Sequence, residues 1–320
     1  MTYPGWLDVH GHFSPPKTPE EKEKTWHAMR EAKFMAPEPF SWEFEEVLKY
    51  NDKAGIAMQM LSNIPPELSA LKASNDFGIS IVQKYPSRFG LLVALPTNNT
   101  KACIEEIERT SAFSPPPDGF AVTTTYAGIW LSDASLEPVW KVLNECRAVV
   151  HVHPDGYAGP AQGRPSPLIE VAFDTARTAV DMLYNGMFRR YPHIKFIFAH
   201  CGGALPVLSG RIALLGAEAW VPNPEKITKE EIKSQLGRLY VDTAASAETG
   251  LAPALKMAGM HGCIYGADCG VPCSREATME ENRKSVLKIE REHGIEAGTI
   301  GNGGYDLFPS AAKRAKGEKL

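Results

Sequence analysis

Short apolar runs rich in β-branched residues alternate along this chain with longer segments of helical periodicity, and this alternation restricts the fold more than any other feature. About eight such runs occur, at residues 7–13, 56–63, 89–96, 119–125, 148–153, 194–200, 238–244 and 263–268. Near-continuous apolar character is typical of parallel strands that helices cover on both faces. Eight parallel strands also suit a closed (β/α)₈ barrel, which takes about 250 residues. We therefore predict a single α/β barrel domain over residues 1–320, with an insertion after the first strand and additional C-terminal helices.

The segments between these runs predict the helices that a barrel requires. They cover residues 41–53, 66–84, 101–110, 136–145, 169–190, 205–215 and 275–293. Ser41 is a candidate N-cap for the first of them, and Gly55 is placed to end it before the next strand. Glu45 and Lys49 are spaced i,i+4 on the same helix and could pair.

Residues 14–40 interrupt the alternation. This segment is rich in Pro, Lys and Glu, and it is far longer than the roughly 2–6 residues of an ordinary βα loop. Long loops at the C-terminal end of a barrel strand commonly cap the active site, so we expect 14–40 to form a lid. A solvated surface insertion is the alternative.

Composition excludes several classes of protein. The chain is 43% hydrophobic and 22% charged, with a formal net charge of −4, so nucleic acid is not expected as the main partner. No stretch approaches the roughly 20 apolar residues of a membrane helix, and no signal peptide is expected at the start. The six cysteines show no C-x-x-C spacing, which argues against a disulfide framework and predicts a cytoplasmic protein.

The histidines and one aspartate carry the clearest chemical signal. His10 and His12 are two residues apart on a predicted strand, so both side chains point to the same face. His153, His200 and Asp268 end three other predicted strands, and barrel enzymes build their sites from such strand ends. Imidazoles and a carboxylate converging at one mouth predict a single divalent metal ion, with zinc favoured and manganese or magnesium as alternatives. Hydrogen-bonded core histidines are the competing interpretation.

Two further observations refine the metal site. His151 shares a face with His153 one layer deeper, so a core histidine that supports the metal ligands is favoured over a direct ligand. No lysine occurs between Lys101 and Lys141, and the fourth strand therefore offers none to bridge two metal ions as a carbamate. The site should be mononuclear.

Several motifs together resemble a known family. They are DVHGHF at 8–13, YPSRFGLLVALP at 85–96, VHVHP at 150–154, YPHIKFIFAHCGGALP at 191–206, YVDTA at 240–244, YGADCGVP at 265–272 and LFP at 307–309. The chain resembles the amidohydrolase superfamily, in the branch of metal-dependent, non-oxidative decarboxylases. That branch includes 2-amino-3-carboxymuconate-6-semialdehyde decarboxylase, γ-resorcylate decarboxylase, isoorotate decarboxylase and fungal 6-methylsalicylate decarboxylase. The motifs span nearly the whole chain but do not specify a substrate.

The resemblance implies roles for individual residues. It implies that the metal ligands are His10, His12, His153 and Asp268, with His200 and Asp268 as the catalytic groups. It also implies that Arg211 binds the substrate carboxylate, in its own subunit or across the interface of a homodimer; a charge on the helix surface is the alternative. An arginine that some members place in the first helix is Lys49 here, which puts recognition by two arginines in doubt.

We predict that the protein removes CO₂ from a small aromatic carboxylate with a neighbouring hydroxyl, such as 6-methylsalicylate. A protonated Asp268 or His200 would deliver a proton to the carbon that bears the carboxylate. Hydrolysis of a lactone or amide on the same barrel is the alternative enzyme function, and a non-catalytic binding protein is a third. Strand-end positions suggest further pocket residues, each of which could instead lie in the core or support a ligand: Phe13, Ser62, Asn63, Thr123, Thr125 and Asp242.

Overall fold

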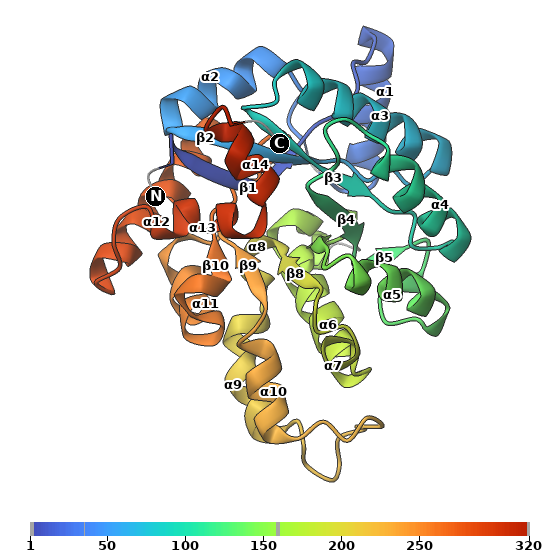
Figure 1. Cartoon of the computed structure of the whole chain (residues 1–320), viewed down its shortest axis with the longest axis vertical. Helices are drawn as coiled ribbons and strands as arrows, with labels where there is room; N and C mark the ends of the chain where they lie inside the picture. The colour runs from blue at the N-terminus through green and yellow to red at the C-terminus, as the bar shows by residue number, and fades with distance from the viewer. Residues whose placement is uncertain (1–2, 35, 158–160, 319–320) are drawn as a thin grey trace.

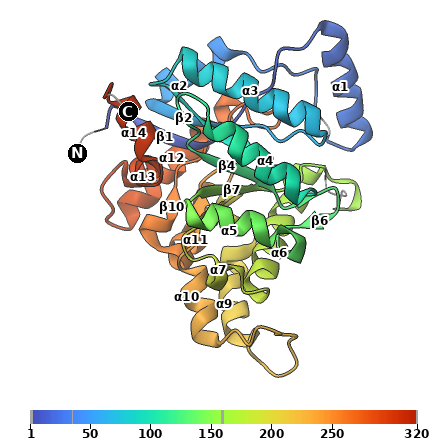
Figure 2. The same cartoon turned by 45° about the vertical axis from the view of Figure 1, so that its right-hand side comes forward.

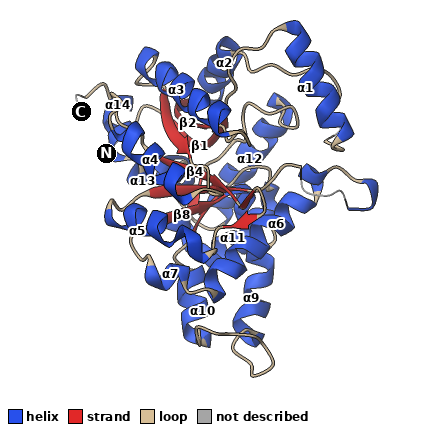
Figure 3. Ribbon diagram, turned by 90° about the vertical axis from the view of Figure 1, so that its right-hand side faces the viewer, coloured by secondary structure: helices blue, strands red, loops and turns tan. Residues whose placement is uncertain are grey.

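Eight parallel strands form the centre of the molecule. The computed structural model describes residues 3–34, 36–157 and 161–318, and within them the strands follow the order β1-β2-β3-β4-β7-β8-β9-β10. Figures 1 and 3 show these strands enclosed by helices. All eight predicted runs contain a strand: β1 (Trp6–His12), β2 (Ile56–Ser62), β3 (Phe89–Ala94), β4 (Gly119–Thr123), β7 (Val149–His153), β8 (Lys195–Phe198), β9 (Tyr240–Asp242) and β10 (Cys263–Ile264).

The first and last strands approach closely enough to nearly close the barrel. The backbone N–H of Val9 donates to the carbonyl of Tyr265 at 2.9 Å, and that of His12 donates to the carbonyl of Cys269 at 2.7 Å. A parallel bridge joins Gly11 to Cys269. The predicted α/β barrel is therefore confirmed.

Helices surround the strands. They are α1 (Pro19–Glu31), α2 (Phe44–Ala54), α3 (Leu68–Lys84), α4 (Thr100–Ser111), α5 (Glu137–Glu145), α6 (Glu170–Tyr184), α7 (Met187–Arg190), α8 (Ala199–Gly202), α9 (Leu205–Leu215), α10 (Lys229–Leu236), α11 (Ala247–Gly262), α12 (Glu276–Glu292), α13 (Thr299–Leu307) and α14 (Pro309–Ala315). Three short 3₁₀ turns, η1 (Ala134–Leu136), η2 (Ala161–Gly163) and η3 (Ser166–Leu168), and a small hairpin of β5 (Thr125–Tyr126) and β6 (Ile129–Trp130) complete the described elements. None of the described helices has the length and apolar character needed to cross a membrane.

Two of the helices differ in extent from the prediction. The helix predicted at 41–53 begins at Phe44, and the Ser41 hydroxyl donates to the Glu43 side chain instead of capping the helix. Gly55 ends this helix as predicted, with a left-handed φ of 72° that a side chain would disfavour. The helix predicted at 169–190 is interrupted between α6 and α7 at Gly186, which has a φ of 65°.

The insertion at 14–40 contains a helix that we did not predict. Helix α1 has a complete capping box, in which Thr18 and Glu21 satisfy each other's backbone N–H groups. It has no buried residue, and Figure 2 shows it standing away from the barrel. The Trp26 indole donates to the carbonyl of Ala36 at 2.8 Å, which ties the helix to the returning chain. Met35 lies outside the described residues. The polar sequence of α1 gives no helical hydrophobic pattern, which explains why the prediction missed it.

The C-terminal helices close the opposite end of the barrel. Phe308 belongs to a buried cluster with Leu7 and Val9 of β1. The Arg314 guanidinium donates to both carboxylate oxygens of Asp118, at 3.1 and 2.9 Å, and to two backbone carbonyls near the start of β3. The predicted C-terminal helices therefore form a floor that fixes the barrel below the site.

Candidate metal-dependent active site

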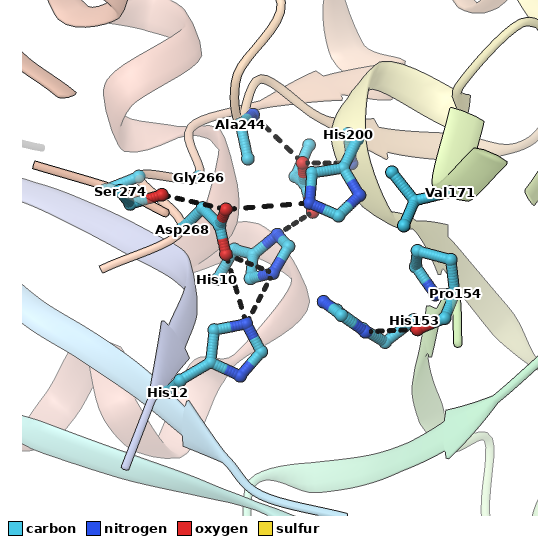
Figure 4. Close-up of polar contacts among 12 residues, drawn as sticks. His10, His12, His153, Pro154, Val171, His200, Ala244, Gly266, Asp268 and Ser274 are labelled. Atoms are coloured by element: carbon cyan, nitrogen blue, oxygen red, sulfur yellow. Dashed lines mark hydrogen bonds and ion pairs between the residues drawn. The ribbon is translucent and has the colours of Figure 1, made fainter. Parts of the chain in front are cut away.

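The predicted metal ligands converge at the C-terminal ends of the strands. One ligand atom from each of His10, His153, His200 and Asp268 lies within 4.8 Å of all the others. His12 joins them, because its Nε2 lies 3.0 Å from His10 Nε2 and 3.2 Å from Asp268 Oδ1. Figure 4 shows the four imidazoles directed toward one another beside Asp268. The structure thus brings all five predicted residues together from four separate strand ends.

The tautomers of two of these histidines favour a cation between them. His153 Nδ1 lies 2.8 Å from the carbonyl of Pro154 and must donate to it, since a carbonyl only accepts. His10 Nδ1 likewise donates to Asp242 Oδ2 at 2.8 Å. Each ring is therefore left with a lone pair on Nε2, and His10 Nε2 faces Asp268 Oδ1 at 3.4 Å. Acceptors that face one another in a buried site fit a divalent metal ion, with each histidine oriented by a hydrogen bond on its far nitrogen.

Burial and neighbouring charges together set the protonation of the cluster. Burial lowers the pKa of His10 to about 4 and holds the pKa of His153 well below its usual value. Burial opposes ionisation of Asp268, but its contacts with His12 and His200 hold its pKa well below the usual range. For His200, burial is outweighed by the contact with Asp268, which raises its pKa. His10 and His153 as neutral imidazoles and Asp268 as a carboxylate are in the forms that bind a metal ion, and the cluster forms a divalent metal site.

Asp242 supports the cluster from behind. Its Oδ2 accepts from His10 and also from His151 Nε2, at 3.0 Å. Its Oδ1 accepts from the backbone N–H groups of His200 and Ala244, at 2.9 and 3.0 Å. With 0% of its surface exposed, Asp242 has no oxygen left for a substrate, contrary to our expectation that it contacts one. The same bonds place His151 in the buried layer behind the ligands.

Two residues of the cluster have a left-handed backbone. His200 and Asp268 have φ values of 53° and 58°, a conformation that costs a residue other than glycine about 1–3 kcal/mol. The hydrogen bond from the His200 N–H to Asp242 helps to hold the first. Near the second, Asp8 Oδ1 accepts from the N–H groups of His10 and Ala267, at 2.9 Å each. These buried carboxylates aim the side chains of His200 and Asp268 into the mouth of the barrel.

A cavity of about 400 Å³ opens above the cluster, within the usual range for small-molecule sites. His12, His153, His200 and Asp268 form its inner end. Its walls are mainly apolar, with a polar side along α12. The residues that define these walls are Phe34, Pro167, Val171, Val271, Met279, Ser246, Thr278, Glu281 and Asn282.

The other predicted pocket residues lie outside this described lining. They are Phe13, Ser62, Asn63, Thr123 and Thr125. Phe13 is buried against Trp42, Asn63 donates to the Ser74 hydroxyl at 2.8 Å, and Thr123 donates to the carbonyl of Thr125 at 2.8 Å. The described lining draws instead on the loops that follow β7, β9 and β10 and on α12.

Residues that follow the later strands were missed. Cys273 and Ser274 come shortly after Asp268, and the Ser274 hydroxyl donates to Asp268 Oδ2 at 2.9 Å. Ser246 and Ala247 follow β9 in the same way. The rule that barrel sites use the loops after the strands could have indicated them. The sequence did not show which of these loops border the cavity.

The two cationic residues considered for the substrate carboxylate are both exposed. Arg211 lies on α9, outside the described lining of the cavity, and its side chain makes no hydrogen bond or ion pair with the residues that the structure describes. Lys49 pairs with Glu46 at 2.6 Å, not with Glu45 as its spacing suggested. Neither residue belongs to the described lining of the cavity in this chain.

A nearly closed parallel barrel with a histidine and aspartate metal site at its C-terminal mouth defines a metal-dependent barrel enzyme. Residues 7–282 match the family model described as Amidohydrolase. Decarboxylase macB of Penicillium terrestre is 29% identical over 76% of this chain and 76% of its own. The 6-methylsalicylic acid decarboxylase of Penicillium expansum is 27% identical over 82% of this chain and 84% of its own.

A solved structure has the same fold. The dihydroxybenzoic acid decarboxylase from Polaromonas sp. JS666, with bound manganese and the inhibitor 2-nitroresorcinol, has a TM-score of 0.74 at 20% identity. The superposition covers 95% of this chain and 97% of the other. The chain belongs to the amidohydrolase family, in its branch of non-oxidative decarboxylases.

Proposed function

We propose that this protein removes CO₂ from a small aromatic acid that carries a hydroxyl beside the carboxylate, such as 6-methylsalicylate. The observation that carries this proposal is the metal site at the inner end of a mainly apolar cavity of about 400 Å³. An aromatic ring suits apolar walls, while a carboxylate and an adjacent hydroxyl suit a cation at the inner end. The names of the decarboxylase relatives support the same chemistry.

The two oxygens of Asp268 face different partners. Oδ1 faces His10 and His12, while Oδ2 lies 3.7 Å from His200 Nε2 and accepts from Ser274. We assign His10, His12, His153 and Asp268 as ligands, and His200 with Asp268 as the catalytic groups. A bound divalent ion would orient the acid and stabilise negative charge on its oxygens. His200 holds the proton that passes to the carbon bearing the carboxylate, and the electrons of the broken carbon–carbon bond return to the ring as CO₂ leaves.

Zinc is the ion that three imidazoles and one carboxylate favour, and manganese is the ion named for the Polaromonas enzyme. We propose zinc as the first candidate and manganese as the second. Mass spectrometry of the purified protein, with reconstitution of the chelated protein by each ion, distinguishes them. Only one ion per chain is expected, because the described cluster contains no bridging lysine.

The test of the function is a substrate panel. Metal-replete protein is incubated with 6-methylsalicylate, related hydroxybenzoates and lactones, and CO₂ and ring-opened products are measured. We expect CO₂ from at least one hydroxybenzoate and none from the His200→Ala variant. Ring opening of a lactone, with no CO₂ from any acid, would replace the decarboxylase with the hydrolase.

The chain is also proposed to act as a homodimer in which Arg211 enters the partner's site. Val207 and Leu214 of α9 are 71% and 60% exposed, and Trp220 in the following loop is 70% exposed. Arg211 is spaced i+4 from Val207, so it lies on the same exposed helix face. Large apolar side chains gathered on one face indicate a protein interface, and a second copy would place an unpaired guanidinium beside a substrate anion.

Mixing two inactive variants tests this arrangement. Arg211→Ala and His200→Ala are unfolded together and refolded as mixed dimers. If Arg211 acts across the interface, one site of each mixed dimer contains both intact residues, and activity returns to part of the wild-type value. Unchanged inactivity in dimers shown by native mass spectrometry to be mixed would place Arg211 in the site of its own subunit. Full activity of Arg211→Ala alone would place Arg211 outside the reaction.

The domain organisation is proposed to be one barrel with residues 14–40 as a lid. Phe34 lines the cavity, and the centroid of its ring lies 5.7 Å from that of Tyr157. Phe34→Ala should raise KM about threefold with little change in kcat, since only apolar contact area is lost. An unchanged KM would favour a surface insertion.

A further inference from the structure

The side of the cavity formed by α12 holds one charged group that the described contacts leave unpaired. It is the carboxylate of Glu281, which lines the cavity and makes no side-chain hydrogen bond or ion pair with the described residues. We propose that Glu281 determines which acids enter: it disfavours a second carboxylate on the outer part of the substrate and favours a hydroxyl or amino donor there. This inference rests on the proposed function and narrows its substrate class to hydroxylated aromatic monocarboxylates.

The polar groups around Glu281 are already occupied. The Asn282 amide accepts from the N–H groups of Ser246 and Ala247 and donates to the carbonyl of Thr243 at 2.7 Å. The Thr278 hydroxyl donates to the carbonyl of Arg275 at 2.9 Å and accepts from its N–H. The Ser246 hydroxyl donates to a backbone carbonyl. Glu281 is therefore the group on this wall that is free to accept a hydrogen bond from a ligand.

No lysine or arginine occurs in the described lining to neutralise this carboxylate. The lysines on the same helix have other partners: Lys284 pairs with Glu280 at 3.8 Å, and Lys288 pairs with Glu248 at 2.6 Å. The cavity is therefore polarised: the metal site lies at its inner end, and the negatively charged carboxylate of Glu281, a hydrogen-bond acceptor, lies on the α12 side. A monoanion can place its carboxylate at the metal and a donor toward Glu281, whereas a dianion must bring like charges together.

The effect should be moderate, because the Glu281 side chain is exposed to solvent. Like charges a few ångströms apart at a solvated wall change an equilibrium by roughly three- to tenfold. Hydrogen bonding to a charged acceptor adds a preference of similar size for a donor. The ratio of the affinity for an acid with a hydroxyl donor to the affinity for an acid with a second carboxylate therefore measures the role of Glu281 better than either affinity alone.

The experiment compares two salicylates that are substituted at the same ring position, either 4 or 5. One compound has a hydroxyl there and the other has a carboxylate. Binding to manganese-loaded protein is measured by titration calorimetry for the wild type, Glu281→Gln and Glu292→Gln. Glu292 lies on the same helix beside Lys288 and outside the described lining, so it controls for a change of charge on α12. Melting temperatures show that each variant is folded.

We expect the wild type to bind the hydroxyl compound at least tenfold more tightly, and Glu281→Gln to reduce this ratio about threefold or more. Glu292→Gln should leave the ratio unchanged. An equal ratio in the wild type and Glu281→Gln, or no binding of either acid, would overturn the inference. Binding with the expected ratio but without release of CO₂ would sink the proposed decarboxylation and leave the role of Glu281 in ligand choice standing.

Discussion

The two ends of the barrel both bury charged groups, but they balance the charge differently. At the floor, Arg314 and Asp118 form a bidentate pair inside the chain, and burial raises the pKa of Asp118 even though Arg314 opposes this. At the mouth, Asp268 Oδ1 faces His10, whose tautomer presents a lone pair on Nε2 to the same centre. The floor is complete within the chain, whereas the mouth requires a cation from outside. The part of the molecule that sustains the fold is therefore separate from the part that performs the chemistry.

The largest effect on activity is expected from removing the negative charge at the mouth. Asp268→Asn should lower kcat about 10³-fold or more, because a metal ligand and the partner of His200 are lost together. Steady-state kinetics and metal content are measured on the same preparation. Ser274→Ala, which removes only the hydrogen bond to Asp268, should have a much smaller effect. A loss below tenfold for Asp268→Asn would show that this carboxylate is not required.

The matching change at the floor should act on stability alone. Arg314→Met leaves Asp118 buried without its partner and should lower the free energy of unfolding by about 3–5 kcal/mol. Urea denaturation measures this loss, and kcat of the folded fraction should not change. The double variant Arg314→Met with Asp118→Leu should recover most of the stability, since no uncompensated charge remains. A fall in kcat in either variant would contradict the conclusion that the floor contributes to stability and not to catalysis.

Removing the support behind the mouth should give an intermediate effect. Asp242→Asn weakens the acceptor that orients His10 and binds the backbone of His200. Changes to such supporting carboxylates cost about 10–100-fold in metal affinity, which competition with a chelator measures. Asp118→Asn is the matched control at the floor and should not alter metal affinity. Equal affinities in the wild type and Asp242→Asn would mean that His10 is oriented without this bond.

The sequence could predict the features that depend on the order of residues within one strand. The eight strands and the convergence of His10, His12, His153, His200 and Asp268 follow from local apolar runs and from positions at strand ends. These features depend on the order of residues along one strand. Even the short β10 was found, because its run is apolar before the chain turns at Asp268.

The cavity walls depend on contacts between distant segments and were not predictable in that way. Asp242 also ends a strand, but its neighbours His10 and His151 come from two other strands and draw it into the buried layer. Glu281 lies on a helix that looks like an ordinary charged surface helix in sequence. Only the packing of α12 against the barrel mouth brings it to the cavity.

The smallest effect on metal affinity is expected from a substitution of His151, which tests whether this residue is a ligand or only supports the ligands. Its Nε2 donates to Asp242 Oδ2, while its Nδ1 is buried without a partner among the described residues. Asp242 would still accept from His10 and from the backbone of His200 and Ala244 after His151→Leu. We therefore expect metal affinity to fall about threefold, consistent with the net value of one hydrogen bond.

Chelator competition measures the metal affinity of His151→Leu and of Asp242→Asn, and the two losses together show which group of residues holds the ion. His10, His151 and Asp242 themselves form a buried group of three potential ligands. If that group held the ion, the two variants would lose affinity equally and by far more than threefold. A small loss for His151→Leu beside a large one for Asp242→Asn would place the ion at the open cluster, because Asp242 acts there through His10 and the His200 backbone while His151 contributes a single bond.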